Sequence, residues 1–232
     1  MTKPRDPSRA PRHSSARPNA ALPRPSPVRM VAAGYAANML VGWALLSLPL
    51  AAAAPSRAID DLFIAVSAVS TAGLVPVDPG TTYSRFGQVV ILLLIQAGLL
   101  IQAGGLGFMT VSSFAFTLIA ANGGGRYQAE VTRTVFSLPR TINPRVFTGR
   151  VVVYTLAVEA AGAAALGALL RARGLEEPFW LGLFHSVSAF CTAGFALFPD
   201  SFERFSADPT VLLVTAALSI LGAIGFLVAS EA

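Results

Sequence analysis

The sequence is poor in charged residues and in cysteine. Only 12% of its 232 residues are Asp, Glu, Lys or Arg, whereas 54% are hydrophobic, and soluble domains carry about 25% charged residues. The composition therefore excludes an ordinary soluble domain and predicts an integral membrane protein. The single cysteine, Cys191, excludes an internal disulfide and a zinc site built from several cysteines.

Acidic residues are scarce in two segments that are rich in Lys and Arg. Residues 1–29 hold seven Lys or Arg and only Asp6, among many Pro and Ser, which is typical of a disordered tail. Residues 123–150 hold five Arg against Glu130. An excess of Lys and Arg marks the cytoplasmic side of a membrane protein. The net charge of +5 therefore does not indicate binding to nucleic acid.

Long apolar runs occur at residues 31–50, 86–121, 151–170 and 210–230, and about 20 residues suffice to span a membrane. Between them lie two shorter apolar segments, 63–74 (FIAVSAVSTAGL) and 184–195 (FHSVSAFCTAGF), which are identical at seven of twelve positions. A short helix that enters the membrane and turns back must have its irregular backbone buried in protein or facing water. The sequence predicts an all-α integral membrane protein with two helix–pore loop–helix units, made of four transmembrane helices and two re-entrant pore helices.

The predicted boundaries follow from these segments: a basic cytoplasmic tail at 1–29, a first unit at 30–122, a cytoplasmic loop at 123–150 and a second unit at 151–232. Four spanning helices place both termini in the cytoplasm of a multi-pass protein of the plasma or inner membrane. Asp60 and Asp61 are expected to cap the first short helix. Eight of the twelve acidic residues then lie outside, where they would attract cations: Asp60, Asp61, Asp78, Glu176, Glu177, Asp200, Glu203 and Asp208.

Each short segment ends in small residues and one glycine. Backbone carbonyls there can replace the hydration shell of a cation, with Gly73 and Gly194 adopting φ angles that other residues avoid. The predicted ion selectivity filter consists of Ser70, Thr71, Ala72, Gly73, Leu74, Cys191, Thr192, Ala193, Gly194 and Phe195. The alternative is that Ala-Gly is only a small pair for helix packing. The repetition of the motif in the same context favours the filter.

Several polar residues lie inside apolar segments. Glu159 is a candidate intramembrane polar site, because acids in spanning helices are costly; a structural partner and a role in the ion pathway both stay open. His185 is expected to pack or hydrogen-bond, and Gln96 and Asn38 to hydrogen-bond between helices. An enzyme that uses Cys191 with His185 is disfavoured, because the two lie six residues apart on one short helix and point to different faces. No enzymatic activity is expected.

The order of these motifs resembles the Trk/Ktr/HKT superfamily of potassium transporters. The matching pieces are DDLFIAVSAVSTAGLVPVDPG, GGLGFMT at 104–110, FHSVSAFCTAGFALFPDSF and GAIGF at 222–226. The resemblance implies potassium uptake across the cell membrane through a pore lined by the backbone carbonyls of the pore loops, either passively or with sodium or proton coupling. It implies filter glycines at Gly73 and Gly194; in that family, serine at such a position goes with sodium permeation.

The resemblance also implies partners. Besides membrane lipid, these are a second copy in a homodimer, or a missing second half, and a cytoplasmic nucleotide-binding regulatory subunit. The chain itself contains no nucleotide-phosphate loop, and no bound cofactor is expected in it.

The sequence departs from the family in two ways. Members usually carry four such units in one chain, and this chain has two, which correspond to the N-terminal half. A non-conducting half-subunit or fragment that assembles with another pore subunit is therefore the alternative function. In addition, residues 93–98 and 99–104 are tandem copies of LLIQAG, where the resemblance leads us to expect one. The glycines at 104–107 would absorb the extra turns, or the duplication impairs packing below the filter; we favour the second.

Overall fold

The computed structural model describes residues 27–102 and 144–229. In these residues every regular element is helical, apart from one antiparallel bridge between Ala52 and Tyr83, and the all-α prediction is confirmed. The elements are α1 (Pro27–Leu46), α2 (Ala58–Ser70), α3 (Pro79–Thr82), α4 (Arg85–Gln102), α7 (Pro144–Ala172), α8 (Pro178–Phe190), the 3-10 turn η1 (Glu203–Phe205) and α9 (Pro209–Ala229).

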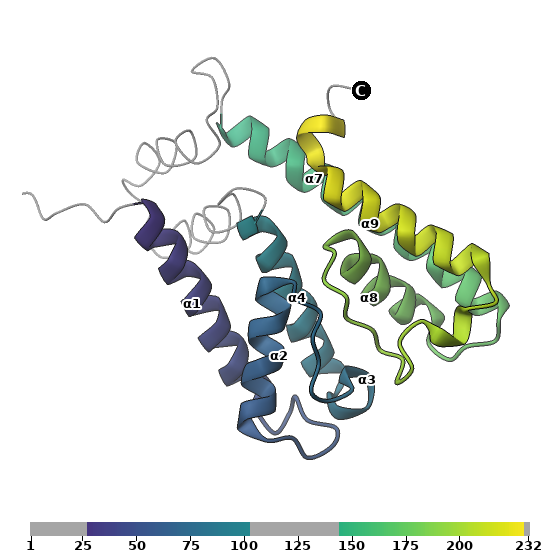
Figure 1. The fold of residues 1–232 in the computed structure, drawn as a ribbon, viewed down its shortest axis with the longest axis horizontal. Coiled ribbons are helices and arrows are strands. Elements are labelled where there is room, and N and C mark those ends of the chain that lie inside the picture. The colour runs from purple at the N-terminus through teal and green to yellow at the C-terminus, as the bar shows by residue number, and fades with distance from the viewer. Residues whose placement is uncertain (1–26, 103–143, 230–232) are drawn as a thin grey trace, which may run out of the picture.

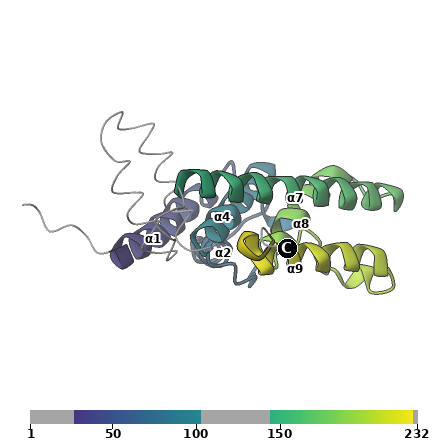
Figure 2. The ribbon, with the colours of Figure 1, turned by 90° about the horizontal axis from the view of Figure 1, so that it is seen from above.

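The helices form two groups that lie side by side (Figure 1). In the first group, α1, α2 and α4 pack against one another, and in the second group α7, α8 and α9 do the same. Helix α8 lies between α7 and α9 when the molecule is seen from above (Figure 2). The contact between α4 and α8 joins the two groups.

One hydrophobic core extends across both groups. It contains Ile64 and Ile91 from the first group and Phe184 and Phe195 from the second, each less than 2% exposed. A smaller cluster lies within the second group and includes Leu166, Leu170, Phe198, Phe205, Val211 and Leu218. Because burial of an apolar side chain contributes roughly 1.5–3 kcal/mol, the shared core holds the ends of the two short helices close to each other.

The two groups repeat the same close packing. A Cβ placed on Gly98 of α4 would lie 2.3 Å from the carbonyl oxygen of Val69, and a Cβ on Gly222 of α9 would lie 1.7 Å from that of Phe190. Val69 and Phe190 occupy the same position in the two similar twelve-residue segments. In both groups, therefore, the second long helix needs a glycine where it crosses the end of the short helix.

The helix boundaries differ from the predicted ones mainly at the starts. Helix α1 begins at Pro27, inside the predicted tail, and α7 begins at Pro144, inside the predicted cytoplasmic loop. Proline is favoured at the first helical position, because its fixed φ suits the helix and its missing N–H would have no partner there. Five of the described helices begin at proline: α1, α3, α7, α8 and α9.

Within residues 27–102 and 144–229, one segment, Gly149–Ala172, is long and apolar enough to cross a membrane by length and composition, and Ala32–Leu46, Arg85–Leu99 and Pro209–Ile224 are shorter apolar helices. The prediction that Asp60 and Asp61 cap α2 is wrong. Arg57 occupies the cap position without a side-chain hydrogen bond, and both acids lie in the first turn of α2. Most of the predicted tail (1–26), most of the predicted loop and the GGLGFMT motif lie outside the described residues.

Candidate functional site

Both short helices end in the same backbone turn. Thr71 and Gly73 follow α2 with φ angles of 50° and 73°, and Thr192 and Gly194 follow α8 with φ angles of 51° and 72°. The left-handed glycines are those that the sequence predicts. The left-handed threonines were not predicted, because a β-branched residue rarely adopts positive φ.

The same backbone hydrogen bond closes each turn. The N–H of Ala72 donates to the Ser67 carbonyl at 3.0 Å, and the N–H of Ala193 donates to the Ser188 carbonyl at 2.8 Å. This is the Schellman pattern of helix termination. It satisfies carbonyls at the helix end and reverses the chain within a few residues, so the predicted filter residues leave each helix in the same direction relative to its axis.

The two turns meet at their glycines. A Cβ placed on Gly73 would lie 2.8 Å from the carbonyl oxygen of Ala193 and 3.2 Å from the Cα of Gly194. A Cβ placed on Gly194 would lie 3.2 Å from the Cα of Gly73. The structure therefore brings together the predicted filter segments 70–74 and 191–195, which are separated by more than one hundred residues of sequence.

The turns differ in how their ends are held. Ser188 donates its hydroxyl to the carbonyl oxygen of Phe195 at 2.7 Å, and Phe195 is only 1% exposed. Ser67 occupies the equivalent position in α2, yet in the described part of the chain its buried hydroxyl has no hydrogen-bond partner, and Leu74 is 63% exposed. Sequence reasoning missed both serines. The fact that both similar segments carry serine at this position could have indicated them.

A buried polar cluster lies beside the second turn. Glu159 of α7 is 3% exposed, and its carboxyl accepts a hydrogen bond from the amide of Gln96 on α4. The sulfur of Cys191 lies 3.5 Å from Gln96 Oε1 and 3.7 Å from Glu159 Oε1. The prediction that Gln96 hydrogen-bonds between helices is confirmed. The same prediction for Asn38 is wrong, because its amide donates to Gly34 O within α1.

Both nitrogens of His185 are engaged by the backbone. The N–H of Leu197 donates to Nε2 at 3.1 Å, which places the ring proton on Nδ1, where it donates to Leu181 O at 2.7 Å. The ring stacks on Phe198 with centroids 4.6 Å apart. His185 is thus the packing and hydrogen-bonding residue that the sequence predicts, and these contacts leave it unable to activate Cys191 as a base.

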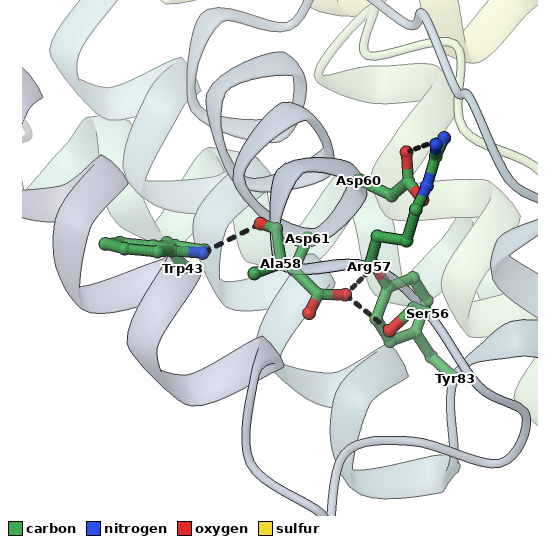
Figure 3. Close-up of polar contacts among 7 residues, drawn as sticks. All are labelled: Trp43, Ser56, Arg57, Ala58, Asp60, Asp61 and Tyr83. Carbon is green, nitrogen blue, oxygen red and sulfur yellow. Dashed lines mark hydrogen bonds and ion pairs between the residues drawn. The ribbon is translucent and has the colours of Figure 1, made fainter.

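A second polar cluster holds the start of α2 (Figure 3). The buried carboxylate of Asp61 accepts hydrogen bonds from the hydroxyls of Tyr83 at 2.8 Å, Ser56 at 2.9 Å and Ser47 at 3.3 Å. Burial raises the pKa of the Tyr83 hydroxyl, and the hydrogen bond to Asp61 acts in the same direction. Nearby, Trp43 Nε1 donates to Ala58 O at 2.9 Å. These contacts fix α2 against α1 and the segment before α4.

Half of the acids predicted for the outer side are neutralised by arginine. Hydrogen bonding to Arg57 lowers the pKa of Asp60, and hydrogen bonding to Arg173 lowers that of Asp208. The other pairs are Glu177 with Arg85 and Asp200 with Arg204. Asp78 caps α3 by accepting from the N–H of Gly80. The attraction of cations by these acids is therefore weaker than their number suggests.

The repeated turns and the repeated glycine packing define an all-helical protein with two internally similar halves. The chain belongs to the TrkH family of cation transport proteins, which residues 36–232 match. It is accordingly a membrane protein, as the composition predicts, and the resemblance to the Trk/Ktr superfamily is confirmed.

Three relatives from bacteria show the extent of the similarity. Ktr system potassium uptake protein B of Bacillus subtilis (strain 168) is 36% identical over 207 residues, which cover 88% of this chain and 44% of the relative. The protein of the same name from Vibrio alginolyticus is 33% identical over 204 residues, covering 88% and 43%. Potassium/sodium uptake protein NtpJ of Enterococcus hirae is 31% identical over 214 residues, covering 88% and 45%. The chain thus spans less than half the length of these relatives.

Proposed function

We propose that the chain takes up potassium ions across the cell membrane through a pore lined by the backbone carbonyls of segments 70–74 and 191–195. The observation that carries the proposal is the meeting of Gly73 and Gly194 at the ends of two similar short helices. The C-terminal end of a helix carries partial negative charge, which favours a cation nearby. The names of the relatives, which are potassium uptake proteins, support the choice of ion.

The proposed architecture has two helix–pore loop–helix units. Helices α1 and α4 frame the pore helix α2, and α7 and α9 frame the pore helix α8. Four spanning helices then place both termini in the cytoplasm, and the arginine-rich segment 123–150 supports the same orientation. The acids and their arginine partners lie at the outer end of the units, where the pore helices begin.

The proposal requires further pore segments. A filter of this kind surrounds the ion with about four loops, and this chain supplies two. The remaining loops come from a second copy of the chain or from the half of the relatives that this chain does not cover. A cytoplasmic nucleotide-binding subunit as regulator, and sodium or protons as coupling ions, belong to the same proposal.

Substitution of Gly73 by serine tests the filter. A side chain at Gly73 meets the Ala193 carbonyl and is strained at φ 73°, so we expect the ratio of sodium to rubidium uptake to rise by roughly tenfold, which equals about 1.4 kcal/mol of lost preference. The matched control is Gly174→Ser. Gly174 has the same φ of 73°, but a Cβ there would meet no atom within 4 Å.

Uptake of radioactive rubidium and sodium into proteoliposomes measures the ratio for the three proteins. An increase in Gly73→Ser alone supports the filter. An equal ratio in wild type and Gly73→Ser removes Gly73 from the filter. An absence of cation uptake by the wild-type chain assembled with the further pore segments contradicts the proposed function itself.

A further inference from the structure

Glu159, Gln96 and Cys191 form a closed ring of three side chains. Each contacts the other two: the Gln96 amide donates to Glu159 Oε2, and the Cys191 sulfur lies 3.5 Å from Gln96 Oε1 and 3.7 Å from Glu159 Oε1. The three residues come from α4, α7 and the residue directly after α8. Gln96 uses its donor end toward the carboxyl and its acceptor end toward the thiol, so its orientation is fixed by both neighbours.

The ring is costly unless it is complete. Glu159 is 3% exposed and Cys191 is 1% exposed, and a buried carboxyl without hydrogen-bond donors carries a penalty of several kcal/mol. Its two oxygens face Gln96 and Cys191, both within the protein. The geometry thus favours a structural partnership over direct contact between the carboxyl and a passing ion.

The ring is attached directly to the second turn. Cys191 is the cap residue of α8, and its N–H donates to Val187 O at 2.9 Å. The left-handed Thr192 comes next in the chain, so a shift of Cys191 displaces the whole segment 192–195. Glu159 is also tied to α8 through its own backbone, because Ser186 donates its hydroxyl to Glu159 O at 2.8 Å.

The ring reaches the first turn through α4. Gln96 lies two residues before Gly98, which packs against the Val69 carbonyl near the end of α2. Helix α4 therefore contacts the end of α2 with Gly98 and the end of α8 with Gln96. Besides the shared core and the contact at the two glycines, this stretch of α4 and its hydrogen bonds thus help to set the positions of the two turns relative to each other.

We infer that Glu159 is a positioning residue for the second filter segment: through Cys191 and Gln96 it sets the spacing between the two filter segments and hence the selectivity among monovalent cations. The inference rests on the proposed function and adds a group that does not contact the ion. In this inference Glu159 influences selectivity, while the backbone carbonyls of the filter segments line the conduction path.

The test compares cation selectivity in ring variants of this chain, each assembled with the further pore segments that complete the filter. Glu159→Leu and Cys191→Ala each remove ring hydrogen bonds, and we expect the rubidium-to-sodium uptake ratio to fall by about fivefold, the effect of roughly one lost hydrogen bond. Cys191→Ser keeps a hydrogen-bond donor and should lose less of the ratio than Cys191→Ala. The exchange Gln96→Glu with Glu159→Gln rebuilds a carboxyl–amide pair and should restore the ratio relative to Glu159→Leu.

Thr155→Val is the matched control, because Thr155 is buried on α7 one turn from Glu159 and lies outside the ring. Protein amount and melting temperature are measured in parallel. If Glu159→Leu fails to accumulate, Cys191→Ala and its Cys191→Ser counterpart decide the question. Unchanged ratios in Cys191→Ala or Glu159→Leu, with a wild type that transports rubidium, overturn the inference alone. An assembled wild-type pore without cation uptake overturns the proposed function instead.

Discussion

Ser67 and Ser188 occupy the same position in the two similar segments, yet their hydroxyls have different hydrogen bonding. Ser188 holds Phe195 O, whereas the buried Ser67 hydroxyl has no hydrogen-bond partner among the described residues. The turn after α8 is therefore held by the Ser188 side chain. The turn after α2 is held by its backbone hydrogen bonds and by its contact with the turn after α8.

We expect Ser188→Ala to destabilise the protein by about 1 kcal/mol, the net contribution of one hydrogen bond. Ser67→Ala should leave stability unchanged or raise it slightly, since it removes a buried polar group that makes no hydrogen bond. The melting temperatures of both variants in the same detergent measure the difference. An equal loss in the two variants would show that Ser67 also bonds to a partner in the membrane.

Residue identity predicted the glycines of the two turns but not the groups that hold them. Gly73 and Gly194 were predictable because a small-residue run after a short helix needs a left-handed position. The ring of Gln96, Glu159 and Cys191 was not, although each residue stood out singly, because their separations along the sequence carry no information about which helices touch.

At the scale of elements, apolar runs predicted the long helices and the repeat predicted the short ones. Helices α1 and α7 begin earlier than predicted, because the prediction did not use the preference of proline for the first helical position, here Pro27 and Pro144. The capping expected of Asp61 fails for a tertiary reason: Ser47, Ser56 and Tyr83 supply three hydroxyls to its carboxylate. A local rule cannot anticipate donors that lie up to 22 residues away.

The tandem LLIQAG at residues 93–104 can be assessed from the packing of its first copy, which lies in α4. That copy supplies Gln96 to the ring and Gly98 to the end of α2. Deletion of residues 99–104 leaves both contacts in place and removes six residues, which shortens a helix by roughly 9 Å and rotates its downstream residues by roughly 240°.

We therefore expect the chain without residues 99–104, joined to the further pore segments to give four units, to support growth of a potassium-uptake-deficient host in low potassium as well as the duplicated form, or better. The rate of growth at limiting potassium measures the effect. If the deletion abolishes growth that the duplicated form supports, the second copy is an adapted feature, and the idea that it impairs packing is wrong.

At the scale of the whole molecule, two turns are too few to surround an ion. We expect purified monomers of this chain in liposomes to show no rubidium uptake, because two of about four filter loops leave the ion incompletely coordinated. Crosslinking fixes the oligomeric state, and flux is measured on the same preparation. Uptake by verified monomers would falsify the requirement for further pore segments.

The polar contacts of the two groups also imply an order of biogenesis. The hydroxyls that satisfy Asp61 all come from residues 47–83 of the same group. In the second group, Glu159 depends on Gln96, and Leu197 packs its carbonyl against Gly80. The hydrogen bonds of Asp61 can thus form within the first group alone, whereas the hydrogen bond of Glu159 to Gln96 forms only when both groups are present.

Gly194 follows Gly73 by 121 residues, and at about 5–20 residues per second the ribosome needs roughly 6–24 s to make them. During that interval the turn at Gly73 is in the membrane before the turn at Gly194 has been synthesised. Ribosome-bound chains arrested far enough beyond residue 102 for α4 to have left the ribosome should already resist protease within α1, α2 and α4. A chain that begins at residue 144 should be degraded when made alone and protected when the first group is made beside it. Nascent membrane segments of this protein are therefore expected to mature in the order in which they are translated.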